Sequence, residues 1–174
     1  IGNWVINEAC RQLREWHLQG HQSWSMAVNL STLQFEQPSL VNTVLNCLAL
    51  HHVPPEMLIL EVTETTAMSN PDESVRVLTE LTKAGVKASI DDFGTGYSSL
   101  LYLKRLPACE LKIDRAFVKE LSGESEDATI VSAIVALAKT LNLKVVAEGV
   151  ETEAQQAFLT ELGCNTLQGY LLGK

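Results

Sequence analysis

The chain is organised around the segment Ser89-Ile90-Asp91-Asp92-Phe93-Gly94-Thr95-Gly96-Tyr97-Ser98-Ser99-Leu100. It follows an apolar run, so a strand-like segment ends in two adjacent carboxylates and a loop with two spaced glycines. Because side chains alternate faces along a strand, Asp91 and Asp92 can serve one site only if the strand ends there. Gly94 and Gly96 permit backbone angles that let a loop fold closely over a ligand. Taken alone, the segment also fits a polar turn after an edge strand.

Composition narrows the class of protein. The 174 residues are long enough for one domain, and 46% hydrophobic residues are enough to build a core. The 13 basic and 21 acidic residues give a net charge of −8, which argues against a nucleic-acid polymer as partner. A phosphate ester would therefore need metal ions to bridge it to this acidic chain. The four cysteines are scattered without a Cys-x-x-Cys pair, which predicts free thiols in a reducing compartment.

Apolar spacing predicts alternating strands and helices. Helices are expected over residues 1–19, 38–51, 70–85, 100–106, 128–141 and 153–162. Strands are expected over residues 25–28, 58–60, 86–91, 111–114, 144–147 and 166–167. The strands are nearly all apolar, and no two are joined by a hairpin turn. This pattern predicts an α/β fold with a parallel sheet covered on both faces.

Polar residues recur at the ends of these strands. The residues that directly follow a strand run are Asn29, Glu61, Asp91, Glu148 and Gln168, and Lys112 lies within the fourth run. The spacing averages about 28 residues per unit, which matches one βα repeat of a (β/α)8 barrel of about 250 residues. Carboxyl ends of barrel strands converge on one mouth. We therefore expect a cluster of oxygen ligands that suits one or two Mg²⁺ or Mn²⁺ ions.

Each residue also has a simpler interpretation. The alternatives are a surface acid for Glu61, the solvated start of a loop for Glu64, a salt bridge with Asp114 for Lys112, and helix-capping acids for Glu148 and Glu151. Polar residues at successive strand ends are hard to obtain from packing needs alone. The joint pattern therefore favours a real site.

The motifs resemble those of a known family, the EAL domain, a bacterial cyclic-di-GMP phosphodiesterase module. The matching segments are Asn29-Leu30-Ser31, Leu60-Glu61-Val62-Thr63-Glu64, Ile90 through Leu100, Leu111-Lys112-Ile113-Asp114, Ala147-Glu148-Gly149-Val150-Glu151-Thr152 and Gln168-Gly169-Tyr170. They cover essentially the whole chain in order. The resemblance implies a TIM-like (β/α)8 barrel that hydrolyses cyclic di-GMP to linear pGpG with two Mg²⁺ or Mn²⁺ ions.

The resemblance also implies a role for each site residue. Asn29, Glu61 and Asp91 would bind the first metal, and Asp91 and Asp92 the second. Glu148 would hold the metal-bound water and act as base, Lys112 would orient that water and the phosphate, and Gln168 would support the second metal. Glu64 would anchor the loop that follows Asp92. The substrate-binding loop residues would be Phe93, Gly94, Thr95 and Gly96, together with Glu151.

Two parts of the family pattern are absent from these residues. The Glu-Ala-Leu motif would lie upstream of Ile1, and the proline that usually follows the final segment would lie beyond Lys174. We therefore expect residues 1–174 to be a single EAL-type domain, taken from a longer multidomain protein. The barrel would lack its first βα unit and its extreme C-terminus, and an incomplete barrel leaves an unpaired edge.

Several functional expectations follow. The first is a metal-dependent phosphodiesterase, the second a cyclic-di-GMP receptor without turnover, and the third an unrelated metal-dependent barrel. A homodimer is expected from the apolar segment 128–141, and sensory or regulatory domains are expected upstream. No apolar run approaches the ~20 residues of a membrane span, and no signal peptide is expected from these residues. We expect the domain to be cytoplasmic. A membrane-anchored parent protein is compatible with this expectation.

Overall fold

The computed structural model describes residues 1–96, 99–119, 121 and 125–173. Six parallel strands form one sheet, in the same order in space as along the chain. The strands are β1 (Met26–Leu30), β2 (Leu58–Thr63), β3 (Lys87–Phe93), β4 (Glu110–Ile113), β5 (Lys144–Ala147) and β6 (Thr166–Leu167). The predicted α/β class and the parallel sheet are confirmed. In the described part of the chain, β1 and β6 form the two edges of the sheet.

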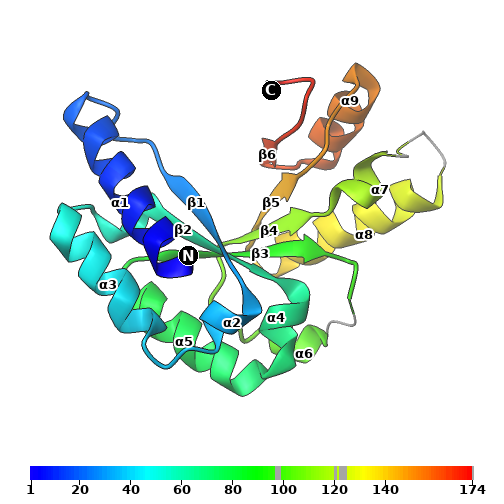
Figure 1. The fold of residues 1–174 in the computed structure, drawn as a ribbon. Helices are drawn as coiled ribbons and strands as arrows, with labels where there is room; N and C mark the ends of the chain where they lie inside the picture. The colour runs from blue at the N-terminus through cyan, green and yellow to red at the C-terminus, as the bar shows by residue number, and fades with distance from the viewer. Residues whose placement is uncertain (97–98, 120, 122–124, 174) are drawn as a thin grey trace.

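Helices connect each strand to the next and lie along the outside of the curved sheet (Figure 1). The longer helices are α1 (Gly2–Leu18), α3 (Leu40–His51), α5 (Pro71–Lys83), α8 (Glu126–Thr140) and α9 (Glu153–Leu162). The shorter ones are α2 (Thr32–Phe35), the 3-10 turn η1 (Pro55–Met57), α4 (Glu64–Ser69), α6 (Leu100–Leu103) and α7 (Arg115–Lys119). The prediction of a sheet covered on both faces was wrong, because the helices pack on one face.

Strand alternation separates the core from the site. On β2, Leu58, Leu60 and Val62 are fully buried in the hydrophobic core under the helices. Glu61 lies between them in sequence and therefore points to the opposite face. The same pattern recurs on β4, where Leu111 and Ile113 belong to the core and Lys112 alternates with them. The polar side chains consequently share the face that carries no helix.

The strand that carries the two aspartates does not end at Asp91 as predicted. β3 continues to Phe93, and its pairing with β4 shifts register between Ile90 and Phe93. Both Ile90 and Phe93 are buried in the core, so two residues rather than one separate two core-facing positions. Asp92 has the left-handed φ of +53° that accommodates this extra residue. A local bulge, and not the end of the strand, therefore takes Asp92 out of the regular alternation.

Other predicted boundaries shift by a few residues. β1 and β2 run past Asn29 and Glu61, which lie inside their strands and not after them. Pro38 precedes α3 instead of occupying its first turn. The helix expected over residues 100–106 ends at Leu103, and its N-cap is Ser99. Ser98, which precedes this N-cap in the sequence and could also cap such a helix, lies outside the described residues.

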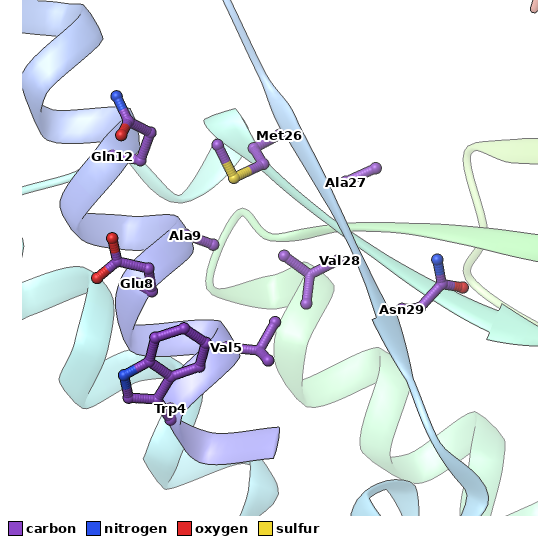
Figure 2. A pocket seen from close by; sticks show the side chains of 9 residues that line it. All are labelled: Trp4, Val5, Glu8, Ala9, Gln12, Met26, Ala27, Val28 and Asn29. Carbon is purple, nitrogen blue, oxygen red and sulfur yellow. The ribbon is translucent and has the colours of Figure 1, made fainter. Parts of the chain in front are cut away.

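A groove lies between α1 and the open edge of β1 (Figure 2). Its volume is about 490 Å³, and its lining includes Trp4 and Val5 of α1 together with Met26 and Val28 of β1. Val28 points toward α1, whereas Asn29 points away from it. The groove therefore follows the open edge of β1, with Val28 on the side of α1 and Ala27 and Asn29 on the other side.

Two further observations concern the chain as a whole. The four cysteines are free thiols, as predicted. Among the helices that the structure describes, none combines the length and the hydropathy needed to cross a lipid bilayer.

Candidate functional site

The first pair of site residues is set by the register of β1 and β2. Asn29 and Glu61 are ladder partners in adjacent strands. Nδ2 of Asn29 donates a hydrogen bond of 3.0 Å to Oε2 of Glu61. Glu61 is buried, while Asn29 is exposed at the sheet edge. An amide oxygen and a carboxylate are thus presented side by side from neighbouring strands.

Lys112 occupies the centre of the polar face. Its Nζ lies 2.9 Å from Oε1 of Glu61, 3.3 Å from Oδ1 of Asp91 and 2.7 Å from Oε1 of Glu148. These partners come from β2, β3 and the residue after β5. The expected meeting of the strand ends is therefore present for Asn29, Glu61, Asp91, Lys112 and Glu148. We call these five residues the carboxylate–lysine cluster.

The cluster overturns three of the simpler interpretations. Glu61 is only 7% exposed and so is not a surface acid. The three described salt bridges of Lys112 run to Glu61, Asp91 and Glu148, so Asp114 is not among its described ion-pair partners. The cap of α9 is formed by Thr152, whose hydroxyl accepts a hydrogen bond from the Gln155 amide, rather than by Glu148 or Glu151.

Burial and neighbouring charges shift the pKa values in this cluster. Burial raises the pKa of Glu61, the nearby Lys112 ammonium opposes that rise, and the charges of Asp91 and Glu148 add to it. For Lys112, burial acts to lower the pKa, but hydrogen bonds to Glu148 and Glu61 and the surrounding negative charge raise it above its usual value. Lys112 is therefore a fixed positive charge among the carboxylates.

Asp114 is a site residue that the pattern of polar residues at strand ends does not reveal. Burial raises the pKa of Asp92, and the charge of Asp91 and a hydrogen bond with Asp114 raise it further. Oδ1 of Asp114 also accepts a 2.6 Å hydrogen bond from the Ala116 amide at the start of α7. Asp114 follows Lys112 by two residues, and this same-face spacing was the signal that could have found it. Asp91, Asp92 and Asp114 thus form an acidic group beside Lys112.

Glu64 connects the site to the glycine loop. It is the first residue of α4 and is 1% exposed, so it is not the solvated loop residue of the simpler interpretation. Its Oε2 accepts a 2.8 Å hydrogen bond from the Gly94 amide. A Cβ at Gly96 would lie 3.1 Å from Oε1 of Glu64, so the loop passes close to this carboxyl group. Glu64 therefore contacts the glycine loop at Gly94, and the anchoring role that the resemblance implied stays a prediction.

The glycine-loop residues are placed differently from one another. Phe93 was expected in the loop, but it lies in β3 and is buried in the core. Gly94 has a φ of +100°, and a Cβ there would lie 2.8 Å from the Phe117 ring. Oγ1 of Thr95 donates a 2.8 Å hydrogen bond to the carbonyl oxygen of Asp92. The loop is therefore held at Gly94 and Thr95, while Phe93 serves packing.

Glu151 and Gln168 lie beside the cluster. They share a cavity of about 190 Å³ with Glu148, Arg115 and Tyr170. The Gln168 amide donates to the Ala147 carbonyl, which brings the end of β6 next to the end of β5. Both side chains are exposed, and neither takes part in the described salt bridges of Lys112. Arg115 was not singled out from the sequence, and it adds a cationic side chain to this acidic mouth.

The donor set fits a hard divalent cation. Carboxylate and amide oxygens are the ligands that Mg²⁺ and Mn²⁺ prefer. In the part of the chain that the structure describes, no group of three His, Cys, Asp or Glu side chains is arranged to hold a metal ion. Lys112 takes up the position between Glu61, Asp91 and Glu148. Binding of a cation by all three carboxylates would therefore require the Lys112 ammonium to move.

The structure defines an α/β protein whose parallel strands carry acidic and amide side chains at their carboxyl ends. The comparison with family models is consistent with this class. The chain belongs to the EAL domain family, whose model matches residues 1–174.

Two relatives in Pseudomonas aeruginosa are similar over the whole chain. The chain is 66% identical over 174 residues to the bifunctional diguanylate cyclase/cyclic di-GMP phosphodiesterase MucR and spans 25% of that protein. It is 47% identical over 174 residues to the cyclic di-GMP phosphodiesterase NbdA and spans 22% of it. The solved structure of the MucR phosphodiesterase in complex with c-di-GMP superimposes with a TM-score of 0.97, covering all of this chain and 70% of that one.

Proposed function

We propose that this chain carries the active site of a metal-dependent phosphodiesterase that hydrolyses cyclic di-GMP to linear pGpG. The observation that carries the proposal is the convergence of Glu61, Asp91 and Glu148 on Lys112, at distances of 2.7–3.3 Å. Oxygen ligands and one fixed ammonium suit a phosphodiester, which brings negative charge to the site. The family and the names of the relatives supply the substrate.

Each side chain has a proposed part in holding the cations. Asn29, Glu61, Asp91 and Asp92 would bind two Mg²⁺ or Mn²⁺ ions, with support from Glu148 and Gln168. Asp114 joins this set because its carboxyl group helps to raise the pKa of Asp92. When bound, such a pair of ions lowers the pKa of a water molecule and stabilises the attacking and leaving oxygens of an in-line displacement.

The remaining residues would handle the proton and the phosphate. Glu148 accepts the proton of the attacking water, whose oxygen forms the new bond to phosphorus as the bond to the ribose 3′ oxygen breaks, and this leaving oxygen takes up a proton from solvent water. Lys112 orients the water and the phosphate from its place beside Glu148. Glu64 holds the glycine loop through Gly94. Thr95, Gly96 and Glu151 would contribute to the walls around the substrate.

The wider organisation is also a proposal. We expect a barrel closed by chain outside these residues, since the described sheet has open edges at β1 and β6. Regulatory domains would share the parent protein, because the chain spans about a quarter of the curated relatives it matches. A cytoplasmic location and a homodimer stay predictions.

Hydrolysis by the complete natural protein tests the function. Cyclic di-GMP is incubated with Mg²⁺ or Mn²⁺, and pGpG is quantified by chromatography for the wild type, Glu148→Ala and Glu161→Ala. Glu161 is an exposed acid at the far end of α9, so it controls for the loss of one charge. We expect turnover by the wild type and by Glu161→Ala, and its loss in Glu148→Ala. Persistence of cyclic di-GMP with all three proteins contradicts the proposal.

Equilibrium binding separates the main alternative. A receptor without turnover would bind cyclic di-GMP, and the wild type would leave it intact with either metal. The position of Lys112 between the carboxylates is the observation that favours this alternative, because an ammonium that stays there keeps a cation out. Binding together with hydrolysis rejects it.

A further inference from the structure

The side chain of Gln155 links the loop that carries Glu148 to the helix that follows β4. Gln155 lies in the first turn of α9 and is 6% exposed. Its Oε1 accepts hydrogen bonds from the amides of Glu151 at 2.8 Å and Thr152 at 2.9 Å. Its Nε2 donates to the carbonyl oxygens of Val118 at 3.0 Å and Lys119 at 3.2 Å. One amide group thus joins two segments more than thirty residues apart.

These four bonds use the full capacity of the side chain. A primary amide has two donor hydrogens and two acceptor lone pairs, and all four are engaged. Gln155 therefore has no group left for a ligand or for water. Any effect on the site must act through the residues that it holds.

Each of the two linked segments adjoins an acidic residue of the site. The loop of residues 148–152 begins with Glu148, whose carboxylate lies 2.7 Å from Lys112. Helix α7 begins directly after Asp114, the acidic residue that lies two positions after Lys112 at the end of β4. Val118 and Lys119 lie at the end of this short helix, where backbone carbonyls have no partner within the helix. Gln155 therefore fixes the distance between α7, which follows Asp114, and the loop that carries Glu148.

A second, independent contact brings the same segments together. Gly149 has a φ of +72°, and a Cβ there would lie 2.7 Å from Cβ of Arg115, the first residue of α7. The loop thus touches α7 at its start through Gly149 and at its end through Gln155. Two contacts on one short helix fix an orientation, whereas one contact would leave a pivot.

A second capping box among the described helices makes the contrast clear. Gln34 has the same place in α2 as Gln155 has in α9, and its Oε1 accepts from the amide and hydroxyl of Ser31. Among the described hydrogen bonds, those of the Gln34 side chain stay within its own box. Helix capping alone therefore requires neither the burial of Gln155 nor its bonds to α7.

We infer that Gln155 is a positioning residue, which sets Glu148 against Lys112 by tying the loop of residues 148–152 to the end of α7. The inference rests on the proposed phosphodiesterase function. Small displacements of a catalytic group reduce the rate of the chemical step more than they reduce substrate binding. Loss of the link should therefore lower kcat and leave KM nearly unchanged.

Three variants of the complete natural protein test this role. Gln155→Met keeps the length of the side chain and removes all four bonds. Gln155→Glu keeps the acceptor for Glu151 and Thr152, and places a carboxylate oxygen against the Val118 and Lys119 carbonyls. Thr152→Val is the matched control, because it removes the hydroxyl that caps α9 and leaves the link to α7 intact. All three weaken the start of the same helix.

The expected result separates positioning from folding. Gln155→Met and Gln155→Glu should lower kcat by about tenfold or more, with KM for cyclic di-GMP changed by less than about threefold. Thr152→Val should keep kcat within about twofold of the wild type. Its melting temperature should fall, because the variant loses the side chain that caps α9. Equal kcat values for Gln155→Met and Thr152→Val at similar melting temperatures overturn the inference.

A readout that does not depend on turnover keeps the two proposals distinguishable. Amide hydrogen exchange at Glu151 and Thr152 should accelerate in Gln155→Met, and remain slow in Thr152→Val. If the wild type hydrolyses no cyclic di-GMP, the proposed function fails while this link is still measured. If the wild type is active and exchange at both amides is unchanged in Gln155→Met, the link itself is rejected.

Discussion

Nζ of Lys112 lies 2.7 Å from Oε1 of Glu148, which joins the side chain of β4 to the residue that follows β5. The same ammonium reaches Glu61 and Asp91 on β2 and β3. A single lysine therefore neutralises part of the negative charge that three strands bring to one place. This arrangement makes the fold of the site independent of a bound cation, and it supports the first prediction.

Replacement of Lys112 by Met should destabilise the metal-free protein. Three carboxylates would lose their shared positive partner, and removal of one member of a buried ion pair costs about 3–5 kcal/mol. The free energy of unfolding should be measured by urea denaturation of the complete protein in a chelator. Mn²⁺ should restore more stability to Lys112→Met than to the wild type, because the cation takes over the role of the ammonium.

The surface pair Arg76–Glu80 provides the control. Arg76 on α5 bonds Glu73 and Glu80 in exposed positions, where solvent screens the charges. Arg76→Met should therefore lower the free energy of unfolding far less than Lys112→Met does. Equal losses for the two variants would show that Lys112 is not holding the carboxylates together.

Replacement of Asp92 by Asn should change how stability depends on pH. The pKa of Asp92 is raised in the folded protein by burial, by the charge of Asp91 and by the hydrogen bond with Asp114. A carboxyl group with a raised pKa contributes stability at low pH that is lost as pH rises through its folded pKa. In a chelator, the stability of Asp92→Asn relative to the wild type should increase between about pH 4 and pH 8. A decrease over this range would contradict the prediction.

Removal of the Glu64 carboxyl group should loosen the glycine loop. In Glu64→Ala the Gly94 amide loses its 2.8 Å partner, and a buried unsatisfied donor costs about 1–3 kcal/mol. Urea denaturation measures the loss, and hydrogen exchange at Gly94 should accelerate. Glu64→Gln retains an acceptor oxygen and should lie between Glu64→Ala and the wild type. Unchanged exchange at Gly94 in Glu64→Ala would show that other contacts hold the loop.

Gly149 should be intolerant of a side chain. Gly149→Ala places a Cβ 2.7 Å from Cβ of Arg115 and forces a left-handed φ of +72°, whose cost is about 1–2 kcal/mol by itself. Gly20 offers a matched control, since its φ is +98° and a Cβ there meets nothing within 4 Å. Gly20→Ala should lower the melting temperature by the backbone cost alone. A larger drop for Gly149→Ala measures the contact with Arg115, and equal drops would exclude it.

The meeting of Glu61, Asp91 and Glu148 was predictable because it depends on simple rules. Apolar runs reveal the strands, parallel order places their carboxyl ends together, and a polar residue at each end marks the site. Helix α5 was equally clear, because Asn70 caps it, Pro71 begins it and Gly85 follows it. These signals are local, and tertiary packing leaves them in place.

The details of β3 were not predictable in the same way. The left-handed conformation of Asp92 and the shift in pairing depend on how β3 lies against β4. Without them, Phe93 reads as a loop residue, although it is buried in the core. The convergence of Lys112 with the carboxylates was expected, but its direct ion pairs were not predictable. A local same-face rule also offers Asp114 two residues away, whereas the partners in the structure are Glu61 on β2, Asp91 on β3 and Glu148 after β5.

The short helices were not predicted from the sequence, because they are too short to show a periodic pattern of apolar residues. Helices α2, α4 and α7 have four to six residues, which is less than two full turns. Their positions matter nonetheless. Helix α4 begins with Glu64, and α7 is the element that Gln155 holds.

The open flank of β1 has a practical consequence for handling these 174 residues by themselves. β1 pairs only with β2 in the described sheet, and the groove beside it is lined by Trp4, Val5 and Met26. Unpaired backbone N–H and C=O groups next to apolar side chains allow strands of other molecules to pair with this edge. A recombinant fragment cut at these boundaries should precipitate or form filaments on concentration, and a soluble preparation requires that flank to be shielded.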